Sequence, residues 1–291
     1  MVRTMDPDPM SAVRPNHVAG KVIVITGAGS GFGRILATMT ASLGARVVAS
    51  DVDADSVQAT VAEIEAAGGQ ALAVPADVTV RGQVEAVVER AVERFGAVDV
   101  LVNNAGVMPL AFFADHRAAA EAWDRAIDIN IKGVVNGISA VYDQMIEQGR
   151  GHVVNISSIY GNQGTAGSGV YSATKAAVRV LSDSLRVEAQ GRIKVTVVRP
   201  TGVGGTGLAA GIVNPDALVG LTGHHADRFG ERIARMGTEG LRPEETDVDD
   251  VRYWAITPED LVREVVHAID QPWGISVGDI TVRATGEDYV I

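Results

Sequence analysis

The sequence predicts an α/β protein whose doubly wound, three-layer α/β/α fold has seven parallel strands with helices on both faces. The 291-residue chain is 46% hydrophobic and 4% aromatic, with 33 glycines, a composition closer to buried parallel strands and tight turns than to a sandwich. From Lys21 onward, apolar runs of strand length alternate with longer stretches of helical period. Because parallel neighbours need a crossover connection, this alternation predicts a parallel sheet.

The individual elements follow from apolar runs and from punctuating residues. Seven runs rich in Val and Ile are expected strands, over 22–26, 45–50, 71–75, 98–102, 152–156, 193–198 and 276–282. Helical periodicity covers 31–43, 54–67, 80–95, 115–148 in two pieces, 169–190 and 258–270. Gly68, Gly96 and Gly149 stand at expected helix ends, and Pro258 stands where the last helix begins.

The chain shows no internal repeat and no second hydrophobic system, so we expect one domain over 21–291. Residues 1–20 contain three prolines and no apolar core of a secretory signal, and we interpret them as a flexible tail. The segment 201–256 lacks strand periodicity and is rich in glycine. A connection this long in a compact domain is usually functional, so we expect a substrate-binding loop or lid. Its acidic run, 244–250, is expected to be a solvated face.

Charge and composition exclude several classes of function. The net charge of −11 argues against binding to nucleic acid or to an anionic membrane surface. No apolar run reaches the ~18 residues that a membrane span needs. The absence of cysteine removes disulfides, thiolate nucleophiles and iron–sulfur ligation. The six histidines form no H-E-x-x-H pattern, His224 and His225 are expected to be a loop doublet, and we expect no metal.

Small and hydrogen-bonding residues follow the carboxyl end of each predicted strand. The first strand leads into Gly27, the second into Asp51 and the third into Asp77. The fourth leads into Asn103–Gly106 and the fifth into Ser157–Ser158, and Pro200 and Thr201 follow the sixth. Ligands of open α/β sheets bind at this edge. The sequence therefore predicts a site there.

Gly27, Gly31 and Gly33 form a G-x-x-x-G-x-G loop between a strand and a helix. Such a loop turns tightly and presents backbone N–H groups and a helix N-terminus to a pyrophosphate. The alternative is a plain glycine-rich turn.

Asp51 closes the second strand, 24 residues after Gly27, near the spacing at which an acid meets an adenosine ribose. A carboxylate there repels the 2′-phosphate of NADP, and Ser30 and Val52 offer no positive charge to bind it. NAD is therefore favoured over NADP. The alternative role for Asp51 is helix capping, which Asp53 or Asp55 could also provide.

Tyr171 and Lys175 stand at positions i and i+4, so they share one face of a helix and can address one site. The alternative is a surface Tyr–Lys pair. A lysine ammonium ~5 Å away at an effective dielectric near 20 would stabilise a phenolate by ~3 kcal/mol. We therefore expect the pKa of Tyr171 to move from its ordinary value near ~10 toward neutrality, where the phenol exchanges protons readily in both directions.

Together these motifs resemble the short-chain dehydrogenase/reductase family in its compact single-domain branch. The resemblance rests on residues 26–33, Asp77, 103–106, Asn130, Ser158 and 171–175, covers about 21–200, and extends to a final helix and strand over 258–282. It implies a Rossmann-type sheet in the order 3-2-1-4-5-6-7 and a nicotinamide cofactor. It also implies oxidation of an alcohol or reduction of a carbonyl by a cytoplasmic homotetramer.

The resemblance also assigns roles. Tyr171 is the general acid/base, Lys175 lowers its pKa and holds the nicotinamide ribose, Ser158 binds the substrate oxygen, and Asn130 belongs to a proton relay at a helix kink. Ser158, rather than Ser157, lies at the family's spacing of thirteen residues before Tyr171. The implied cofactor contacts are Gly27, Ser30, Gly31, Phe32, Gly33, Asp51, Val52, Asp77, Val78, Asn104, Ala105, Gly106, Tyr171, Lys175, Pro200, Gly202 and Val203. The chain departs from the family's Pro-Gly after strand six, because Thr201 separates Pro200 from Gly202; whether Thr201 or Thr206 meets the carboxamide is left open.

The substrate pocket is predicted to be apolar, suited to a hydrophobic secondary alcohol or ketone. Met108 and Tyr160 adjoin the cofactor loops, and the lid contributes Leu208, Ile212, Leu218, Leu221 and Phe229. Asp115, His116 or Tyr160 is a candidate reader of a polar group, with a surface role as the alternative for the first two. The predicted activity is NAD-dependent hydride transfer by an alcohol dehydrogenase or ketoreductase. The alternatives are an NADP-linked carbonyl or enoyl reductase and a non-catalytic dinucleotide-binding scaffold.

Overall fold

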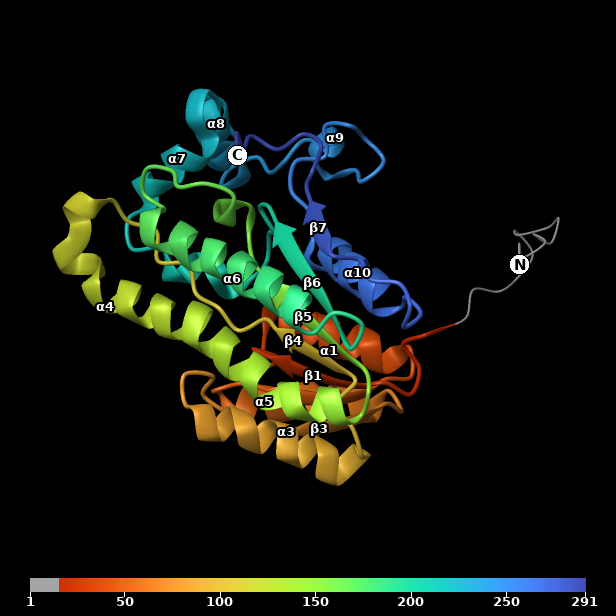
Figure 1. The fold of residues 1–291 in the computed structure, drawn as a ribbon. Coiled ribbons are helices and arrows are strands. Elements are labelled where there is room, and N and C mark those ends of the chain that lie inside the picture. The colour runs from red at the N-terminus through yellow and green to blue at the C-terminus, as the bar shows by residue number, and fades with distance from the viewer. Residues whose placement is uncertain (1–15) are drawn as a thin grey trace, which may run out of the picture.

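The computed structural model describes residues 16–291 and contains the expected sheet of seven parallel strands in the order β3-β2-β1-β4-β5-β6-β7 (Figure 1). The strands are β1 (Val22–Thr26), β2 (Arg46–Ser50), β3 (Gln70–Ala73), β4 (Val100–Asn103), β5 (Gly151–Ile156), β6 (Ile193–Pro200) and β7 (Asp279–Val282). The prediction of fold class and strand order is confirmed, and the strand boundaries differ from the predicted ones by up to three residues.

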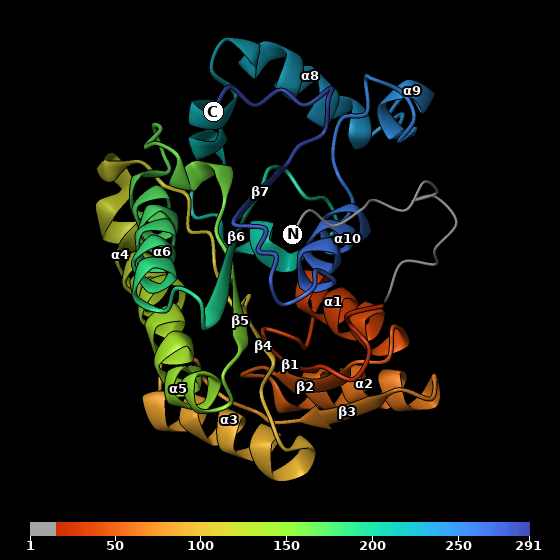
Figure 2. The same cartoon turned by 45° about the vertical axis from the view of Figure 1, so that its right-hand side comes forward.

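Six helices cover the two faces of the sheet (Figure 2). One face carries α1 (Gly31–Ser42), α2 (Ala54–Ala66) and α10 (Pro258–Ile269), and the other carries α3 (Arg81–Phe95), α5 (Gly133–Glu147) and α6 (Gly169–Glu188). Alternate residues of β1 serve the two layers: Ile23 and Ile25 pack toward the first, Val22 and Val24 toward the second. Because successive side chains of a strand point to opposite faces, a strand covered on both sides is apolar throughout.

The predicted helix signals lie where the helices begin and end. Gly96 ends α3 in the left-handed region at φ 83°, which a glycine adopts without strain. Asp53 caps α2 by accepting hydrogen bonds from the N–H groups of Asp55 and Ser56. Thr257 caps α10, with Pro258 at its first turn. Asp53 therefore provides the capping that was the alternative role for Asp51.

The long helical stretch after β4 consists of two helices, as predicted. Helix α4 (His116–Ile127) and helix α5 are joined by one π-helical turn over Asp128–Lys132. A π-helical turn inserts a bulge into the helix and is frequent at functional sites. Asn130 lies inside this turn and is fully buried.

The prediction that 201–256 is a loop was wrong in its local structure. The segment contains α7 (Val219–Thr222), α8 (Ala226–Met236) and α9 (Pro243–Thr246) together with short 3₁₀ turns, one of which includes His224 and His225. Its two ends meet, since Val203 forms a parallel bridge to Ile256. Helices α8 and α9 lie together beyond the carboxyl edge of the sheet (Figure 2). We call residues 201–256 the lid segment.

Two further expectations need correction. Glu245, within the acidic run expected to be solvated, is 6% exposed and is bound by the guanidinium groups of Arg232 and Arg235. The tail predicted over 1–20 lies partly outside the described residues, but residues 16–20 are held in place. Asn16 accepts hydrogen bonds from the N–H groups of Val18 and Ala19, and Val18 is fully buried.

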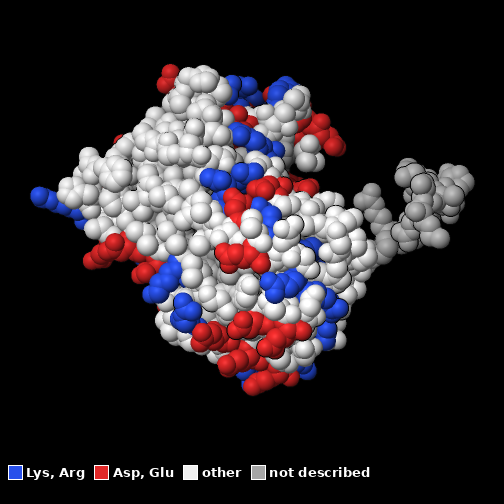
Figure 3. Space-filling model, in the orientation of Figure 1, with Lys and Arg blue, Asp and Glu red and all other residues white. Residues whose placement is uncertain are grey.

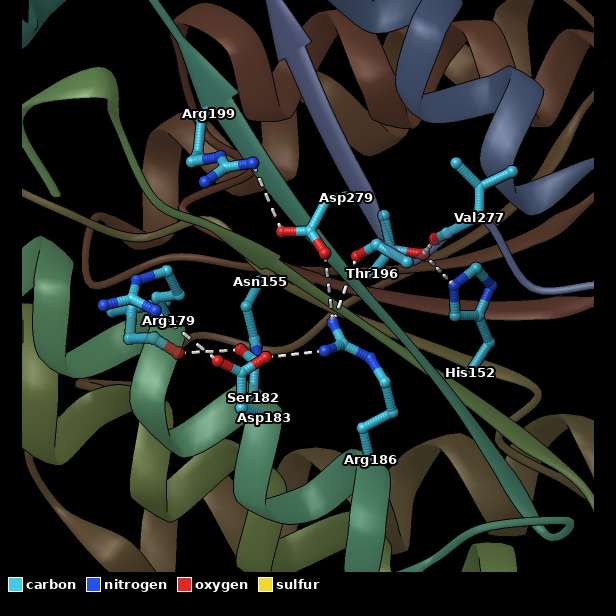
Figure 4. A network of polar contacts seen from close by, with 12 residues as sticks. His152, Asn155, Arg179, Ser182, Asp183, Arg186, Thr196, Arg199, Val277 and Asp279 are labelled. Carbon is cyan, nitrogen blue, oxygen red and sulfur yellow. Dashed lines mark hydrogen bonds and ion pairs between the residues drawn. The ribbon is translucent and has the colours of Figure 1, made fainter. Parts of the chain in front are cut away.

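The edge strand β7 is fastened by polar contacts as well as by its ladder with β6 (Figure 4). Asp279 of β7 forms ion pairs with Arg186 of α6 and Arg199 of β6, at 3.7 and 3.4 Å. Thr196 donates to the carbonyl of Val277 at 2.6 Å, and its oxygen is 2.8 Å from Nε2 of the fully buried His152. Since the single hydroxyl proton of Thr196 is used on Val277, His152 is the donor through Nε2, which leaves its buried Nδ1 unprotonated and without a partner among the described residues.

The face shown in Figure 3 has no continuous basic surface: acidic side chains gather toward its α3 edge, and elsewhere Lys and Arg are interspersed with Asp and Glu. Within residues 16–291, none of the helices combines the length and the apolar character needed to cross a bilayer.

Candidate active site

The glycine loop between β1 and α1 is shaped by a close approach to the chain after β4. Asn104 donates through Nδ2 to the carbonyls of Thr26 and Gly27, at 2.9 and 3.1 Å. Gly27 has φ +66°, and a Cβ there would lie 2.9 Å from Asn104 Nδ2. A Cβ at Gly33 would lie 2.1 Å from the carbonyl oxygen of Gly27. Both positions therefore require glycine, and the loop is a folded cradle rather than an unconstrained turn.

The cradle presents the N-terminus of α1. Ser30 is the N-cap residue, its side chain makes no capping hydrogen bond, and the first turn contains no acidic residue. The first backbone N–H groups of the helix, at Gly31, Phe32 and Gly33, thus have no capping partner and suit an anionic ligand. The side chain of Phe32 is buried in the core, so Phe32 can contribute its backbone only. Thr206 of the lid segment approaches Gly31 from above, 3.8 Å from a Cβ built at that glycine.

Asp51 lies at the end of β2 beside this cradle. Its Oδ2 accepts the N–H of Gly29 at 2.9 Å and its Oδ1 accepts the N–H of Asp53 at 3.1 Å. Each oxygen keeps a free lone pair for a ligand hydroxyl. Val52 next to it is 67% exposed, and the nearby Arg34 is held by Glu63 at 2.5 Å.

The remaining residues of the predicted adenosine side line the strand ends. Asp77 accepts hydrogen bonds from the N–H and the hydroxyl of Thr79, and the Val78 carbonyl accepts from Asn136 Nδ2. The N–H groups of Asn104 and Ala105 both donate to the hydroxyl of Thr26. Gly106 lies beside Asn130 and Lys175, because a Cβ there would lie 3.2 Å from Asn130 Oδ1 and 3.4 Å from Lys175 Nζ.

Ser158, Tyr171 and Lys175 converge in one buried site, each at most 6% exposed. Lys175 Nζ lies 5.9 Å from the centre of the Tyr171 ring and donates to the Ile156 carbonyl at 2.9 Å. Ser158 Oγ accepts the Tyr160 N–H at 3.3 Å, and the Ser158 hydroxyl lies near enough to the phenol of Tyr171 to lower its pKa. The adjacent Ser157 is committed elsewhere, because its hydroxyl donates to the Lys175 carbonyl at 2.8 Å. The geometry thus favours Ser158 over Ser157.

The expectation that Lys175 lowers the pKa of Tyr171 is not met by the protein groups alone. Burial raises the pKa of Tyr171 to about 12, and the Ser158 hydroxyl acts in the opposite direction. Burial also lowers the pKa of Lys175 to about 8. Desolvation disfavours the charged form of both side chains. Desolvation is the largest cause of the pKa shift of both side chains.

Asn130 holds the chain after β4 against α6. Its Nδ2 donates to the Val107 carbonyl at 2.9 Å and to the Thr174 hydroxyl at 3.1 Å, and its Oδ1 accepts the Val107 N–H at 3.0 Å. The π-helical turn places this side chain beside Gly106 and Lys175. This π-helical turn lies where the helix kink was expected.

After β6 the chain turns past the C-terminal tail. A Cβ at Gly202 would lie 2.2 Å from Tyr289 Oη, so glycine allows this tyrosine to approach the backbone. Thr201, which follows Pro200, donates its N–H to the Val282 carbonyl. Its hydroxyl is buried near Glu287 and makes no hydrogen bond within residues 16–291. Between the two open alternatives, Thr206 lies over the cradle and Thr201 faces the tail. Val203 is occupied by its bridge to Ile256.

An apolar cluster surrounds the Tyr171 ring. Its buried members are Leu110, Ile159, Tyr160, Tyr171, Ala217 and Leu221, with Met108, Phe112, Ile212, Leu218, Tyr289 and Ile291 packed against them. We call these residues the tyrosine cluster. Three of the five predicted lid residues belong to it; Leu208 is 37% exposed, and Phe229 instead packs between Trp254 and Tyr289.

Asp115 and His116 have local roles. Asp115 Oδ2 accepts hydrogen bonds from the Phe112 N–H and from Asn214 Nδ2, which ties the lid segment to the chain before α4. His116 is exposed beside the Phe113 carbonyl. Of the three candidates for a polar reader, the structure brings only Tyr160 into the cluster. Sequence reasoning missed Tyr289 and Ile291, because no motif marks the last residues of the chain.

Known proteins share both the sequence and the fold. A family model described as short chain dehydrogenase matches residues 21–216. An uncharacterized oxidoreductase of Listeria monocytogenes is 33% identical over 272 residues, covering 94% of this chain and 99% of the relative.

Two solved structures are similar over most of their length. A short-chain dehydrogenase/reductase from Burkholderia phymatum in complex with NAD has a TM-score of 0.71 and 31% identity, over 91% of this chain and 89% of that one. A 7α-hydroxysteroid dehydrogenase in complex with NADH and 7-oxo-glycochenodeoxycholic acid has a TM-score of 0.75 and 25% identity, over 94% and 97% of the two chains.

Proposed function

Because the chain belongs to the short-chain dehydrogenase/reductase family and is an oxidoreductase, we propose that it transfers a hydride between NAD and a hydrophobic secondary alcohol or its ketone. The observation that carries the proposal is the convergence of Ser158, Tyr171 and Lys175 in one buried site, at the edge of the sheet where the glycine cradle opens. Each of these side chains has a role in moving a proton to or from a substrate oxygen.

The residues present fit a dinucleotide. The uncapped N-terminus of α1 and the glycines that allow close approach suit a pyrophosphate. The lone pairs of Asp51 suit ribose hydroxyls, and its charge disfavours a 2′-phosphate. Ser30, Gly31, Phe32 and Gly33 would hold the pyrophosphate, Asp77, Val78 and Asn104–Gly106 the adenosine side, and Tyr171, Lys175, Pro200, Gly202 and Thr206 the nicotinamide side.

Within this site Tyr171 Oη is the group that gives or takes the proton. In reduction the phenol donates its proton to the substrate oxygen, and in oxidation the phenolate receives it. Ser158 Oγ donates a hydrogen bond to the same oxygen, which stabilises the charge that develops there. When bound, the oxidised nicotinamide supplies the hydride acceptor and a positive charge that favours the phenolate.

Lys175 and Asn130 support this proton transfer. Lys175 remains close enough to stabilise the phenolate once it forms, and its pKa of about 8 leaves the ammonium predominant at neutral pH. Asn130 fixes Val107 and Thr174 around it. The protein groups alone leave the pKa of Tyr171 at about 12. We therefore expect the loaded enzyme to work better as the pH rises, in the direction of alcohol oxidation.

The tyrosine cluster supports a hydrophobic substrate. Its members are apolar except for the phenol hydroxyls, and they surround the Tyr171 ring. The hydroxysteroid dehydrogenase that shares this fold was solved with a large oxo-steroid, which is consistent with an apolar ketone here.

We further propose a homotetramer built on helical faces. Helix α6 lies alongside the continuous helical stretch of α4 and α5 (Figure 1), and Ile127, Val180 and Val187 on α4 and α6 are 45%, 58% and 74% exposed. A contiguous patch of such side chains would favour an interface. Light scattering of the purified protein would return four times the chain mass, and a monomer would refute the proposal.

The activity is tested by absorbance at 340 nm, with NAD⁺ or NADP⁺ and a panel of secondary alcohols. Formation of NADH with at least one apolar alcohol, and slower turnover with NADP⁺, supports the proposal. Turnover with NADP⁺ alone would show an NADP-linked enzyme. Reduction of an activated double bond, with no carbonyl or alcohol turned over, would show an enoyl reductase. Tight cofactor binding without any turnover would indicate a scaffold.

A further inference from the structure

The hydroxyl of Tyr160 is buried beside Tyr171 and has no hydrogen-bond partner among residues 16–291. The residue is 4% exposed, and its ring packs edge-on against that of Tyr171, with the ring centres 5.5 Å apart and an interplanar angle of 72°. A buried polar group without a partner destabilises a fold, and such groups are rare in native structures. Phenylalanine would fill the same space without that cost, so the hydroxyl calls for a partner from outside the described chain.

The surroundings of this hydroxyl are otherwise apolar. Three of the five tyrosines in the sequence, Tyr160, Tyr171 and Tyr289, gather in the tyrosine cluster, whose other members are apolar. The Ser158 hydroxyl lowers the pKa of the neighbouring Tyr171. Burial raises the pKa of Tyr160, with contributions from Tyr289 and Tyr171, so its phenol stays a neutral donor.

Tyr289, in the C-terminal tail, packs against the same tyrosine cluster. Its Oη lies 2.2 Å from the position that a Cβ of residue 202 would take, so only glycine at this position allows the approach. Its ring is flanked by Phe229 of α8, with ring centres 6.3 Å apart, and the preceding Asp288 is fully buried and bound by Trp254 and Arg228. The tail therefore holds Tyr289 in a fixed position.

We infer that the substrate carries a second, neutral oxygen, which the hydroxyls of Tyr160 and Tyr289 bind while Ser158 and Tyr171 address the reacting oxygen. This inference rests on the proposed function and narrows its substrate class to hydrophobic hydroxyketones, diketones, keto-ethers and their alcohols. A carboxylate in the same place would be desolvated against Leu110 and Ile159, at a large cost in free energy. Tyr160 and Tyr289 are thus specificity-determining residues.

The test compares 2-octanone with the hydroxy-2-octanones that carry the hydroxyl on carbon 4, 5, 6 or 7, with NADH as the reductant. For at least one isomer, we expect kcat/KM to exceed that of 2-octanone by about tenfold, because the site rejects an analogue that leaves its polar group unpaired. In Tyr160→Phe this ratio falls to about one, and in Tyr289→Phe it falls by a smaller factor. Tyr142→Phe, a tyrosine of α5 outside the cluster, is the matched control and keeps the wild-type ratio.

A binding measurement keeps the inference separate from the proposed catalysis. In a Tyr171→Phe background loaded with NADH, calorimetry gives the affinity for the same ketones without turnover. We expect the preferred hydroxyketone to bind about tenfold more tightly than 2-octanone, and the Tyr160→Phe substitution to remove this difference. If every isomer matches 2-octanone, or if the preference survives Tyr160→Phe, the inference is overturned and a bridging water explains Tyr160. That result leaves the proposed function intact, whereas binding preference without any catalysis in the wild type would refute the proposed function alone.

Discussion

Strand β1 buries all five of its residues, Val22–Thr26, whereas the eleven residues of α8 in the lid segment include none that is buried. The sheet is held by alternating Val and Ile packed on both faces. Three arginines of α8, namely Arg228, Arg232 and Arg235, form ion pairs with two buried carboxylates. Apolar packing is insensitive to pH, but a buried ion pair loses its attraction when either partner is removed or neutralised.

The two carboxylates come from different parts of the chain. Asp288 belongs to the C-terminal tail and is fully buried; Glu245 belongs to α9 and is 6% exposed. Burial alone would raise the pKa of Glu245, but hydrogen bonds from the Arg242 N–H, Arg235 and Arg232 lower it to about 2. Arg232 contacts both carboxylates. This one side chain therefore joins α8, α9 and the tail that carries Tyr289.

The largest effect on the stability of the lid segment is expected when Arg232 is replaced. Arg232→Met leaves Glu245 and Asp288 each with one fewer cation, and removing a partner of a buried pair costs about 3 kcal/mol. Because the cost is local, we expect the lid segment to be cut by protease about 100-fold faster, while the sheet remains intact. Limited proteolysis with mass spectrometry of the fragments measures this.

Arg90→Met is the matched control, since Arg90 and Glu93 form an exposed pair on α3 and such pairs contribute ~0–1 kcal/mol. Cleavage of the lid segment at the wild-type rate in Arg232→Met would show that packing, and not charge, holds α8.

A second prediction places a pH-sensitive group inside the apolar region. His152 on β5 is fully buried, and burial together with Lys194 and Lys21 holds its pKa well below 6.5 (Figure 4). The unfolded chain therefore binds a proton near pH 6.5 that the folded chain does not. Stability is lost as the pH falls from 6.5 toward the folded-state pKa, by up to about 1.4 kcal/mol per pH unit.

Urea unfolding of the wild type and of His152→Gln between pH 7 and pH 5 isolates this contribution. The glutamine amide can still donate to Thr196, but it does not titrate. We expect the slope of the unfolding free energy against pH to be smaller in the variant by up to about 1.4 kcal/mol per pH unit, which is the contribution of one proton. Equal slopes would mean that His152 is not the group responsible.

A third prediction concerns Asp51, which lies at the end of β2 in the apolar sheet. Asp51→Ala removes the carboxylate that we propose repels a 2′-phosphate. We expect the proposed preference for NAD over NADP to narrow at least tenfold, which is about 1.4 kcal/mol. Steady-state kcat/KM with the two cofactors measures it. An unchanged ratio would show that Asp51 does not lie at the ribose.

The same contrast explains what could be predicted from the sequence. The seven strands were found because strands buried on both faces are nearly continuous in Val and Ile, and the glycine loop and the Tyr171–Lys175 pair were found because their spacing is local. The sequence places His152 in a strand but gives no sign of its hydrogen bond, because its partner Thr196 lies on a neighbouring strand. The tautomer of a buried histidine, and whether each of its nitrogens has a hydrogen-bond partner, depend on such distant neighbours.

The lid segment could not be predicted for the same reason. Helix α8 is short of apolar residues, and the groups that stabilise it, Glu245 and Asp288, lie 13 and 56 residues away from Arg232 in the sequence. The acidic run at 244–250 has the composition of a solvated face, and only the fold reveals that one of its members is buried. Tyr289 carries no motif, and its role follows from the space that Gly202 leaves.

The central claim is that the phenol of Tyr171 carries the proton, and Tyr171→Phe tests it most directly. The substitution removes one oxygen from a buried ring and leaves the cradle around Gly27 and Asp51 unchanged, so NADH binding, followed by fluorescence titration, is expected to stay near that of the wild type. Turnover of the best alcohol in the 340 nm assay is expected to fall at least 1000-fold, within the range that general acid–base groups contribute. Retention of more than a few per cent of wild-type turnover would contradict the account.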